Sequence, residues 1–265
     1  MDYTIVYKTY KNDLNWLKYS LLSIKKYISN TPEIVIYYHD QCQEELNILL
    51  EELNIDLKYR LIPVEYDING YLKQMVIKCV CFEDIATEYI LIMDCDVILN
   101  DFFDIKDLID ENDKINWYYL SKTESNKNDD QWRVWEKSIK NMVNEDMNNF
   151  YMYNGFPFLF KRETLDLAYQ KFISLHGIDY NEFCKRSLNE NNISINDPIT
   201  GADGKFETMA TIFEEFEYLG WYSYNHTNDY SFIEGPNLMS IRSQFWSHGG
   251  LTPEIKKEIE SILSK

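Results

Sequence analysis

The sequence has few basic residues and no long apolar run. Lys and Arg number 26 against 44 Asp and Glu, a formal net charge of -18 at pH 7. This negative balance opposes binding to nucleic acid or to an anionic membrane surface. No segment approaches the roughly 20 apolar residues of a membrane span, and the amino terminus lacks the basic and apolar regions of a signal peptide. We therefore expect a soluble, cytoplasmic protein that meets anionic ligands with local cations or a metal.

Cysteine and histidine are also scarce. The five cysteines form an odd set in mostly apolar surroundings, which argues against a disulfide framework and favours a reducing compartment. Cys79 and Cys81 have no second pair or histidine nearby, so we expect no zinc site there. His39, His176 and His226 show no spacing that indicates a functional role.

Alternating strand-like and helix-like patterns fill the first hundred residues. They predict successive βα units and a mainly parallel, Rossmann-like sheet. The expected strands cover residues 3–10, 34–38, 57–63 and 89–99, and the expected helices cover residues 14–28, 44–53 and 72–80. Asp13 is a candidate cap of the first helix. With 265 residues, 45% of them hydrophobic, and no visible repeat or linker, we expect a single domain over residues 1–265.

The second half is less regular. A polar stretch at 121–130 predicts a loop, and Asn154-Gly155 interrupts an expected strand at 151–160. Helices are expected at 131–143, 165–175 and 206–219, followed by a short terminal helix capped by Thr252. The acids Glu214, Glu215 and Glu217 are expected on a solvated helix face.

Two carboxylates interrupt the apolar run at 89–99. In an extended strand Asp94 and Asp96 would share a face, with Cα atoms roughly 6–7 Å apart, and could hold one divalent cation. The alternative is a pair of solvated turn residues at a strand end. Because apolar residues resume at Val97, unpaired charges here would be expensive, which favours the metal. The order of elements places the pair at a strand's carboxyl end, where open α/β sheets bind ligands.

This Asp-x-Asp after a hydrophobic strand resembles the signature of glycosyltransferases with the GT-A fold. The segment 70–78, Gly-Tyr-Leu-Lys-Gln-Met-Val-Ile-Lys, is similar to a helix of small bacterial and viral GT-A-like proteins, in which Gln and Lys face the sugar nucleotide. The segment 245–250, Phe-Trp-Ser-His-Gly-Gly, is similar to a late segment whose His completes the metal site. The resemblance implies an α/β fold with a mixed, mainly parallel sheet flanked by helices. Residues 1–110 would bind the nucleotide sugar and residues 111–265 would form the acceptor side.

The resemblance also implies a metal-dependent, hexosyltransferase-like enzyme that moves a sugar from a UDP- or GDP-sugar to a hydroxyl of a glycan or other acceptor. Sugar transfer favours such a metal, because the diphosphate leaving group gains negative charge as the glycosidic bond breaks and Mn²⁺ or Mg²⁺ stabilises that charge. Asp94 and Asp96 offer hard oxygen ligands, and Asp94 could contact the ribose as well. His248 is the candidate third ligand, although a lone His could equally be a packed surface residue.

Further donor contacts are expected at two strand ends and on the 70–78 segment. The candidates are Thr9, Tyr10, Tyr71, Gln74, Lys78, Asn154 and Gly155. Lys8, Lys78 and Arg242 are candidate diphosphate contacts, each also explained as a solvated charge. Trp132, Trp135 and Trp221 are candidate sugar platforms or core residues.

An inverting enzyme also needs a carboxylate base near the acceptor hydroxyl. Glu207 is the first candidate and Asp203 the second, while the alternative role of Glu207 is to favour a helix amino terminus electrostatically. A retaining enzyme would not use Glu207 as a base.

Two other classes remain open. The sequence Asp94-Cys95-Asp96-Val97 also resembles the nucleophile motif of haloacid-dehalogenase-type phosphatases, in which the first Asp attacks phosphorus. That motif normally lies near a domain's amino terminus, whereas three βα-like units precede it here. The third possibility is a non-catalytic carbohydrate-binding protein with a GT-A-like fold, since fold does not establish function.

Overall fold

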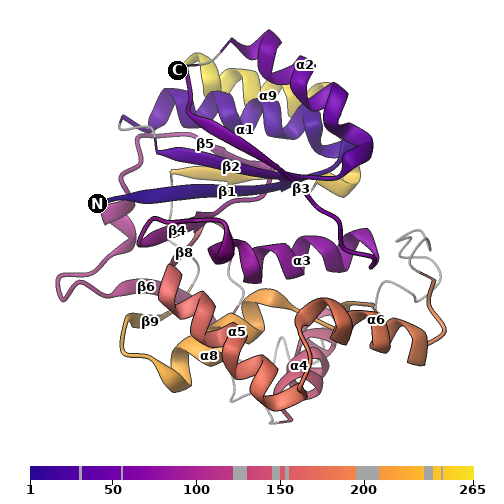
Figure 1. Cartoon of the computed structure of the whole chain (residues 1–265). Helices are drawn as coiled ribbons and strands as arrows, with labels where there is room; N and C mark the ends of the chain where they lie inside the picture. The colour runs from indigo at the N-terminus through magenta and orange to yellow at the C-terminus, as the bar shows by residue number, and fades with distance from the viewer. Residues whose placement is uncertain are drawn as a thin grey trace.

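A five-stranded sheet lies at the centre of the computed structural model, in the order β3-β2-β1-β4-β8 (Figure 1). The structure describes residues 1–29, 32–54, 56–121, 130–144, 150–152, 155–194, 209–235, 241–245 and 247–265. The central strands are β1 (Tyr3–Thr9), β2 (Glu33–Tyr38), β3 (Tyr59–Pro63), β4 (Tyr89–Ile92) and β8 (Phe158–Lys161). All neighbours pair in parallel except β8, which is antiparallel to β4.

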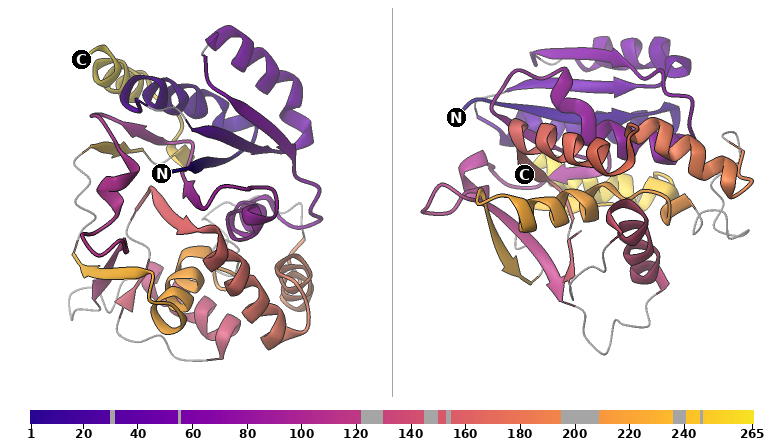
Figure 2. Two further views of the ribbon diagram at one scale, coloured as in Figure 1. Left: turned by 60° about the vertical axis from the view of Figure 1, so that its left-hand side comes forward. Right: turned by 60° about the horizontal axis from the view of Figure 1, so that its bottom comes forward.

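Helices cover both faces of this sheet. On one face lie α1 (Leu14–Tyr27), α2 (Gln43–Leu53) and α9 (Pro253–Ser264), and on the other lies α3 (Gly70–Val80) (Figures 1 and 2). Every residue of β1 is buried, as expected for a parallel strand covered on both sides. The predicted α/β class with a mainly parallel sheet flanked by helices is therefore confirmed.

Two smaller sheets adjoin the central one. β5 (Val97–Leu99) pairs antiparallel with β10 (Arg242–Gln244). β6 (Ile115–Ser121) lies between β7 (Phe150–Tyr151), which is antiparallel to it, and β9 (Tyr230–Glu234), which is parallel. The remaining helices, α4 (Asp130–Val143), α5 (Arg162–His176), α6 (Tyr180–Glu190) and α8 (Glu215–His226), belong to the half of the molecule below α3 in Figure 1.

The expected single strand at 89–99 is wrong, because the chain changes sheets within it. β4 stays in the central sheet, whereas β5 lies along α1, where Ser20 Oγ donates to the Val97 carbonyl at 2.6 Å. Leu99 N–H donates to Ser23 Oγ at 3.0 Å and fixes the other end of β5. Apolar patterning alone does not reveal this change, since both strands are fully buried.

The predicted elements of the second half are confirmed in part. The helices expected at 131–143 and 165–175 are α4 and α5. The strand expected at 151–160 consists of β7 and β8, which belong to different sheets. The helix expected at 206–219 has the wrong bounds: α8 begins at Glu215, and 206–208 lie outside the described residues, as do 122–129 of the predicted polar loop.

Thr252 caps α9 as expected, accepting a hydrogen bond from Ile255 N–H at 3.3 Å. Among the described helices, none combines the length and apolar character needed to cross a bilayer.

Candidate functional site

The two carboxylates lie in a turn between β4 and β5. Met93 N–H donates to the Val6 carbonyl at 3.0 Å, one residue beyond the last residue of β4 that pairs with β1. Val97 N–H then donates to the Asp94 carbonyl at 3.2 Å and closes the turn. The pair lies at the carboxyl end of a central strand, as the order of elements predicts. The expected extended geometry is wrong, because the chain turns there to reach the second sheet.

Asp96 is buried and one of its oxygens lacks a partner. The residue is 8% exposed, and Asp96 Oδ2 accepts a hydrogen bond from Ser247 N–H at 2.9 Å. Asp96 Oδ1 is buried without a hydrogen-bond partner among the described residues. Burial, together with the charge of Asp94, raises the pKa of Asp96 to about 7. A cation at this oxygen would relieve both the missing contact and the charge repulsion.

Asp94, whose side chain is 31% exposed, forms an ion pair with the buried Lys78 of α3. Lys78 Nζ lies 2.9 Å from Asp94 Oδ1 and 3.0 Å from Glu215 Oε1, at the first residue of α8. Burial lowers the pKa of Lys78, but the charges of Asp94 and Glu215 and the hydrogen bonds to them outweigh it and raise the pKa overall. Lys78 therefore joins the turn to the second half of the chain as a fixed positive charge.

Aromatic rings surround the same ammonium group. Lys78 Nζ lies 4.8 Å from the ring centroid of Phe156 and 5.2 Å from that of Phe216. The Phe216 ring stacks on Phe158 of β8 at a centroid distance of 4.0 Å. Such cation–π contacts are stronger when desolvated, so they add to the restraint on Lys78.

Asp13 is a further buried carboxylate that interacts with the charge of Asp94 in the turn. It occupies the N-cap position of α1, but its side chain makes no capping hydrogen bond, so the predicted cap is wrong. Instead it forms side-chain hydrogen bonds with Tyr10 and Ser247. Burial raises its pKa to about 6; the charge of Lys8 opposes this rise and the charge of Asp94 adds to it. The main chain and side chain of Ser247 thus connect Asp13 with Asp96.

The other predicted donor contacts lie on β1 and α3. Thr9 is buried at the end of β1 and Tyr10 is 37% exposed just beyond it. Tyr71 and Gln74 are half-buried on α3, and Asn69 Oδ1 caps that helix by accepting from Tyr71 N–H at 2.9 Å. These side chains lie on elements that flank the turn.

Gly155 lies against Arg242. Its φ is +88°, and a Cβ added there would stand 2.3 Å from Arg242 Nη2. Arg242 Nη1 donates to Gln244 Oε1 at 3.0 Å. Glycine therefore allows the guanidinium group of β10 to approach the chain just before β8.

Several predicted site residues cannot be placed. Asn154, Asp203 and Glu207 lie outside the described residues. The main chain of His248 belongs to a 3₁₀ turn (Ser247–Gly249), while its side chain is outside the description. Among the described side chains, no three His, Cys, Asp or Glu residues group as metal ligands.

Sequence reasoning missed the acids at the start of α8. Glu214, Glu215 and Glu217 are 4%, 3% and 1% exposed, so the predicted solvated face is wrong. Glu214 Oε2 caps α8 by accepting from Glu217 N–H at 2.6 Å, and Glu217 accepts from Met152 N–H at 3.0 and 3.1 Å. Apolar residues flank these acids on both sides, Ile212-Phe213 before them and Tyr218-Leu219 after them. These flanks were the sequence signal that the acids are buried.

Trp221 is a core residue and not an exposed sugar platform. It is 5% exposed and stacks on Tyr218 at 5.9 Å.

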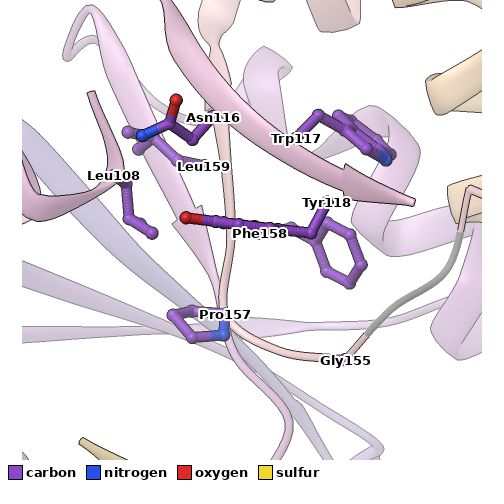
Figure 3. Close-up of a pocket in the computed structure, with 8 residues that line it drawn as sticks. All are labelled: Leu108, Asn116, Trp117, Tyr118, Gly155, Pro157, Phe158 and Leu159. Carbon is purple, nitrogen blue, oxygen red and sulfur yellow. The ribbon is translucent and has the colours of Figure 1, made fainter. Parts of the chain in front are cut away.

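A small pocket opens beside β6 and β8 (Figure 3). Tyr118 lies across it with its hydroxyl toward Leu108 and above Pro157, whereas Trp117 points away. A second, open hollow lies between α9 and the β5–β10 pair, lined by Asn100, Ser243, Glu254, Lys257 and Ser261, among others. Asp94 and Asp96 line neither hollow.

The fold and site define an α/β protein with buried carboxylates at the carboxyl end of a central parallel strand. A family model described as a family of unknown function (DUF6492) matches residues 18–194, and the chain belongs to that family. No curated protein matches it. Among solved structures it is similar to the galactosyltransferase LgtC in complex with donor and acceptor sugar analogs, at a TM-score of 0.44 and 13% identity over 68% of each chain. Similarity at that level carries no inference about function.

Proposed function

We propose that this chain is a metal-dependent glycosyltransferase of the GT-A type, related to small bacterial and viral GT-A-like proteins. It would move a sugar from a UDP- or GDP-sugar to a hydroxyl of a glycan or glycoconjugate. The observation that carries the proposal is the buried, unpartnered Oδ1 of Asp96, next to Asp94 at the carboxyl end of a central strand. Ligands of open α/β sheets bind at this edge.

The donor set fits a hard divalent cation. Asp94 and Asp96 would hold Mn²⁺ or Mg²⁺ through carboxylate oxygens, with His248 as the proposed third ligand. When bound, the metal neutralises charge on the departing diphosphate. Because Lys78 already neutralises one carboxylate oxygen at 2.9 Å, the turn can approach an anionic ligand despite its acids.

The roles of the other candidate residues follow from the same proposed glycosyltransferase function. Thr9, Tyr10, Tyr71, Gln74, Lys78, Asn154 and Gly155 would contact the donor. Glu207, or in its place Asp203, would act as the base toward the acceptor hydroxyl if the reaction inverts. Residues 1–110 would form the donor half and residues 111–265 the acceptor half of one domain. The cytoplasm is the proposed location, since five buried free thiols suit a reducing compartment.

Thermal stability with a panel of nucleotide sugars, with and without Mn²⁺, tests this proposal, because a ligand that prefers the native state raises the midpoint. We expect a manganese-dependent rise with a UDP- or GDP-sugar in the wild type and in Asp101→Asn, an exposed acid on the same segment. We expect no rise in Asp96→Asn. Hydrolysis of a simple phosphate ester without any response to nucleotide sugars would favour the phosphatase. Binding of the donor without its consumption would favour the non-catalytic protein.

A further inference from the structure

The segment around Ser247 contacts both Asp96 and the start of α1. Phe245 N–H donates to the Asp96 carbonyl at 2.9 Å, and Ser247 N–H donates to Asp96 Oδ2 at 2.9 Å. The Phe245 ring also stacks on Trp16 of α1, with ring centroids 6.0 Å apart. The Ser247 side chain forms a hydrogen bond with Asp13, the residue just before α1. The late segment therefore joins α1 to the turn that carries the two acids.

Asp13 is held firmly at the junction of β1 and α1. It ends a 3₁₀ turn (Lys11–Asp13), where its N–H donates to the Tyr10 carbonyl at 2.9 Å. The residue is 8% exposed, and its carboxylate interacts with the charge of Lys8 and accepts a hydrogen bond from the Tyr10 side chain. An ionised carboxylate only accepts hydrogen bonds, so the Ser247 hydroxyl is the donor in its contact with Asp13. Asp13 thus gives the late segment a fixed acceptor.

The orientation of the Asp96 carboxylate depends on the Ser247 amide. Within the described part of the chain, Oδ2 accepts from this amide and Oδ1 has no partner. The amide therefore restrains the carboxylate while leaving Oδ1 available to a cation. Carboxylates that bind metals are held by such outer hydrogen bonds. Ser247 itself opens a 3₁₀ turn that ends in the exposed Gly249, so its contact with Asp13 is a main restraint on its position.

We propose that Asp13 is a positioning residue for the metal site. It holds the Ser247 hydroxyl, and the Ser247 amide in turn orients Asp96 toward the cation. Asp13 acts through Ser247 and does not itself bind the metal. This inference rests on the proposed function.

Titration calorimetry of Mn²⁺, with UDP or GDP present, into wild type and Ser247→Ala is the direct test, because this variant leaves Asp13 and its buried neighbours intact. We expect Mn²⁺ to bind about tenfold more weakly to Ser247→Ala, as is typical when an outer hydrogen-bond partner is lost. Ser247→Thr keeps the hydroxyl and should retain most of the affinity. Ser243→Ala is the matched control: its hydroxyl accepts from Asn100 Nδ2 at 3.3 Å, beyond the far end of β5 from Asp96, and it should bind Mn²⁺ as the wild type does.

A double-mutant cycle measures whether Asp13 acts through Ser247. Asp13→Ala removes the acceptor and a negative charge, whereas Asp13→Asn keeps an acceptor oxygen without the charge. Asp13→Asn should therefore bind Mn²⁺ more tightly than Asp13→Ala. The fold-loss of affinity caused by Asp13→Ala should be about ten times smaller in the Ser247→Ala background than in the wild type, because the hydrogen bond is already absent there.

Amide exchange of Ser247, followed by NMR in the metal-free protein, gives a readout that does not depend on the metal. We expect exchange about fivefold faster in Asp13→Ala than in the wild type, because the amide loses its restraint, and a smaller increase in Asp13→Asn.

Unchanged Mn²⁺ affinity in Ser247→Ala, beside a wild type that binds Mn²⁺, would overturn the inference and leave the proposed function intact. Equal losses from Asp13→Ala in the two backgrounds would also overturn it, because Asp13 would then act independently of Ser247. Unchanged exchange of the Ser247 amide in Asp13→Ala would overturn it as well. If the wild type binds no Mn²⁺ with either nucleotide, the proposed function fails and the inference fails with it.

Discussion

At the scale of single residues, Asp96 combines burial, a missing hydrogen bond and a neighbouring negative charge. Its folded pKa of about 7 lies above the 3.8 of an unperturbed aspartate. The native state therefore binds more protons than the unfolded state between these values, and the free energy of unfolding falls as pH rises through that window. A metal at this position would compete with protons and remove the penalty.

Asp96→Asn should therefore stabilise the metal-free protein at pH 8, by about 1–2 kcal/mol, and flatten the loss of stability between pH 4 and pH 7. Urea unfolding across this pH range, in the presence of a chelator, measures both effects. Asp101→Asn serves as the control and should follow the wild-type pH dependence. A variant less stable than the wild type at pH 8 would contradict the picture of an uncompensated charge.

Lys78 presents the opposite case, a buried charge with two partners. Lys78→Met leaves Asp94 and Glu215 uncompensated and should cost about 3–5 kcal/mol in the free energy of unfolding. Adding Glu215→Gln should restore part of that loss, because one of the two uncompensated charges is removed. Chemical denaturation of the single and double variants measures the coupling.

Lys185→Met is the matched control for this prediction, because its partner Asp67 is 66% exposed and the two groups are 3.3 Å apart. Such an exposed pair contributes at most about 1 kcal/mol. Equal losses in Lys78→Met and Lys185→Met would show that burial of the Lys78 cluster has no energetic consequence.

At the scale of elements, the local patterns predicted most helices and the central strands to within a few residues. α1, α2 and α3 carry apolar residues at three- and four-residue steps. This spacing is typical of a helix with one buried face, so the sequence pattern predicted them. The split of 89–99 was not predictable, since β5 is separated from β4 by its pairing with β10, about 145 residues later in the chain. Such a partner leaves no mark on local periodicity.

The prediction that the acids at the start of α8 are solvated was wrong for a related reason. Its acids looked solvated because charged residues usually are, but their partners are Lys78 on α3 and the Met152 amide. Neither lies near α8 in the sequence. The Asp94–Asp96 position at a strand end could be read from the order of elements, whereas the contribution of Glu215 could not.

Gly220 shows how tightly α8 packs. A Cβ there would lie 2.4 Å from Met152 Cβ and 3.0 Å from Trp117 Cζ2. Gly220→Ala should lower the free energy of unfolding by about 1–3 kcal/mol through overpacking, although alanine favours a helix by about 1 kcal/mol. Gly70→Ala is the control: α3 leaves no atom within 4 Å of the added methyl, so that variant should be neutral or stabilised. A higher midpoint of thermal unfolding in Gly220→Ala than in the wild type would contradict this tight packing.

At the scale of the whole molecule, the candidate site gathers parts from distant segments. β1 and the turn after β4 come from the first hundred residues, Glu215 comes from α8, and Ser247 comes from the segment after β10. Phe245 N–H also donates to the Asp96 carbonyl at 2.9 Å, so the late segment continues along the turn beyond β10. The formal net charge of the whole chain is -18, which opposes the approach of an anion.

The central claim is that Asp96 holds a divalent cation together with a nucleotide diphosphate. Titration calorimetry of Mn²⁺ into the wild type and Asp96→Asn, each with and without UDP or GDP, measures this directly. The account predicts saturable binding to the wild type that tightens when one nucleotide is present, and binding at least about tenfold weaker in Asp96→Asn. Equal Mn²⁺ affinity in the two proteins, with no effect of either nucleotide, would contradict it.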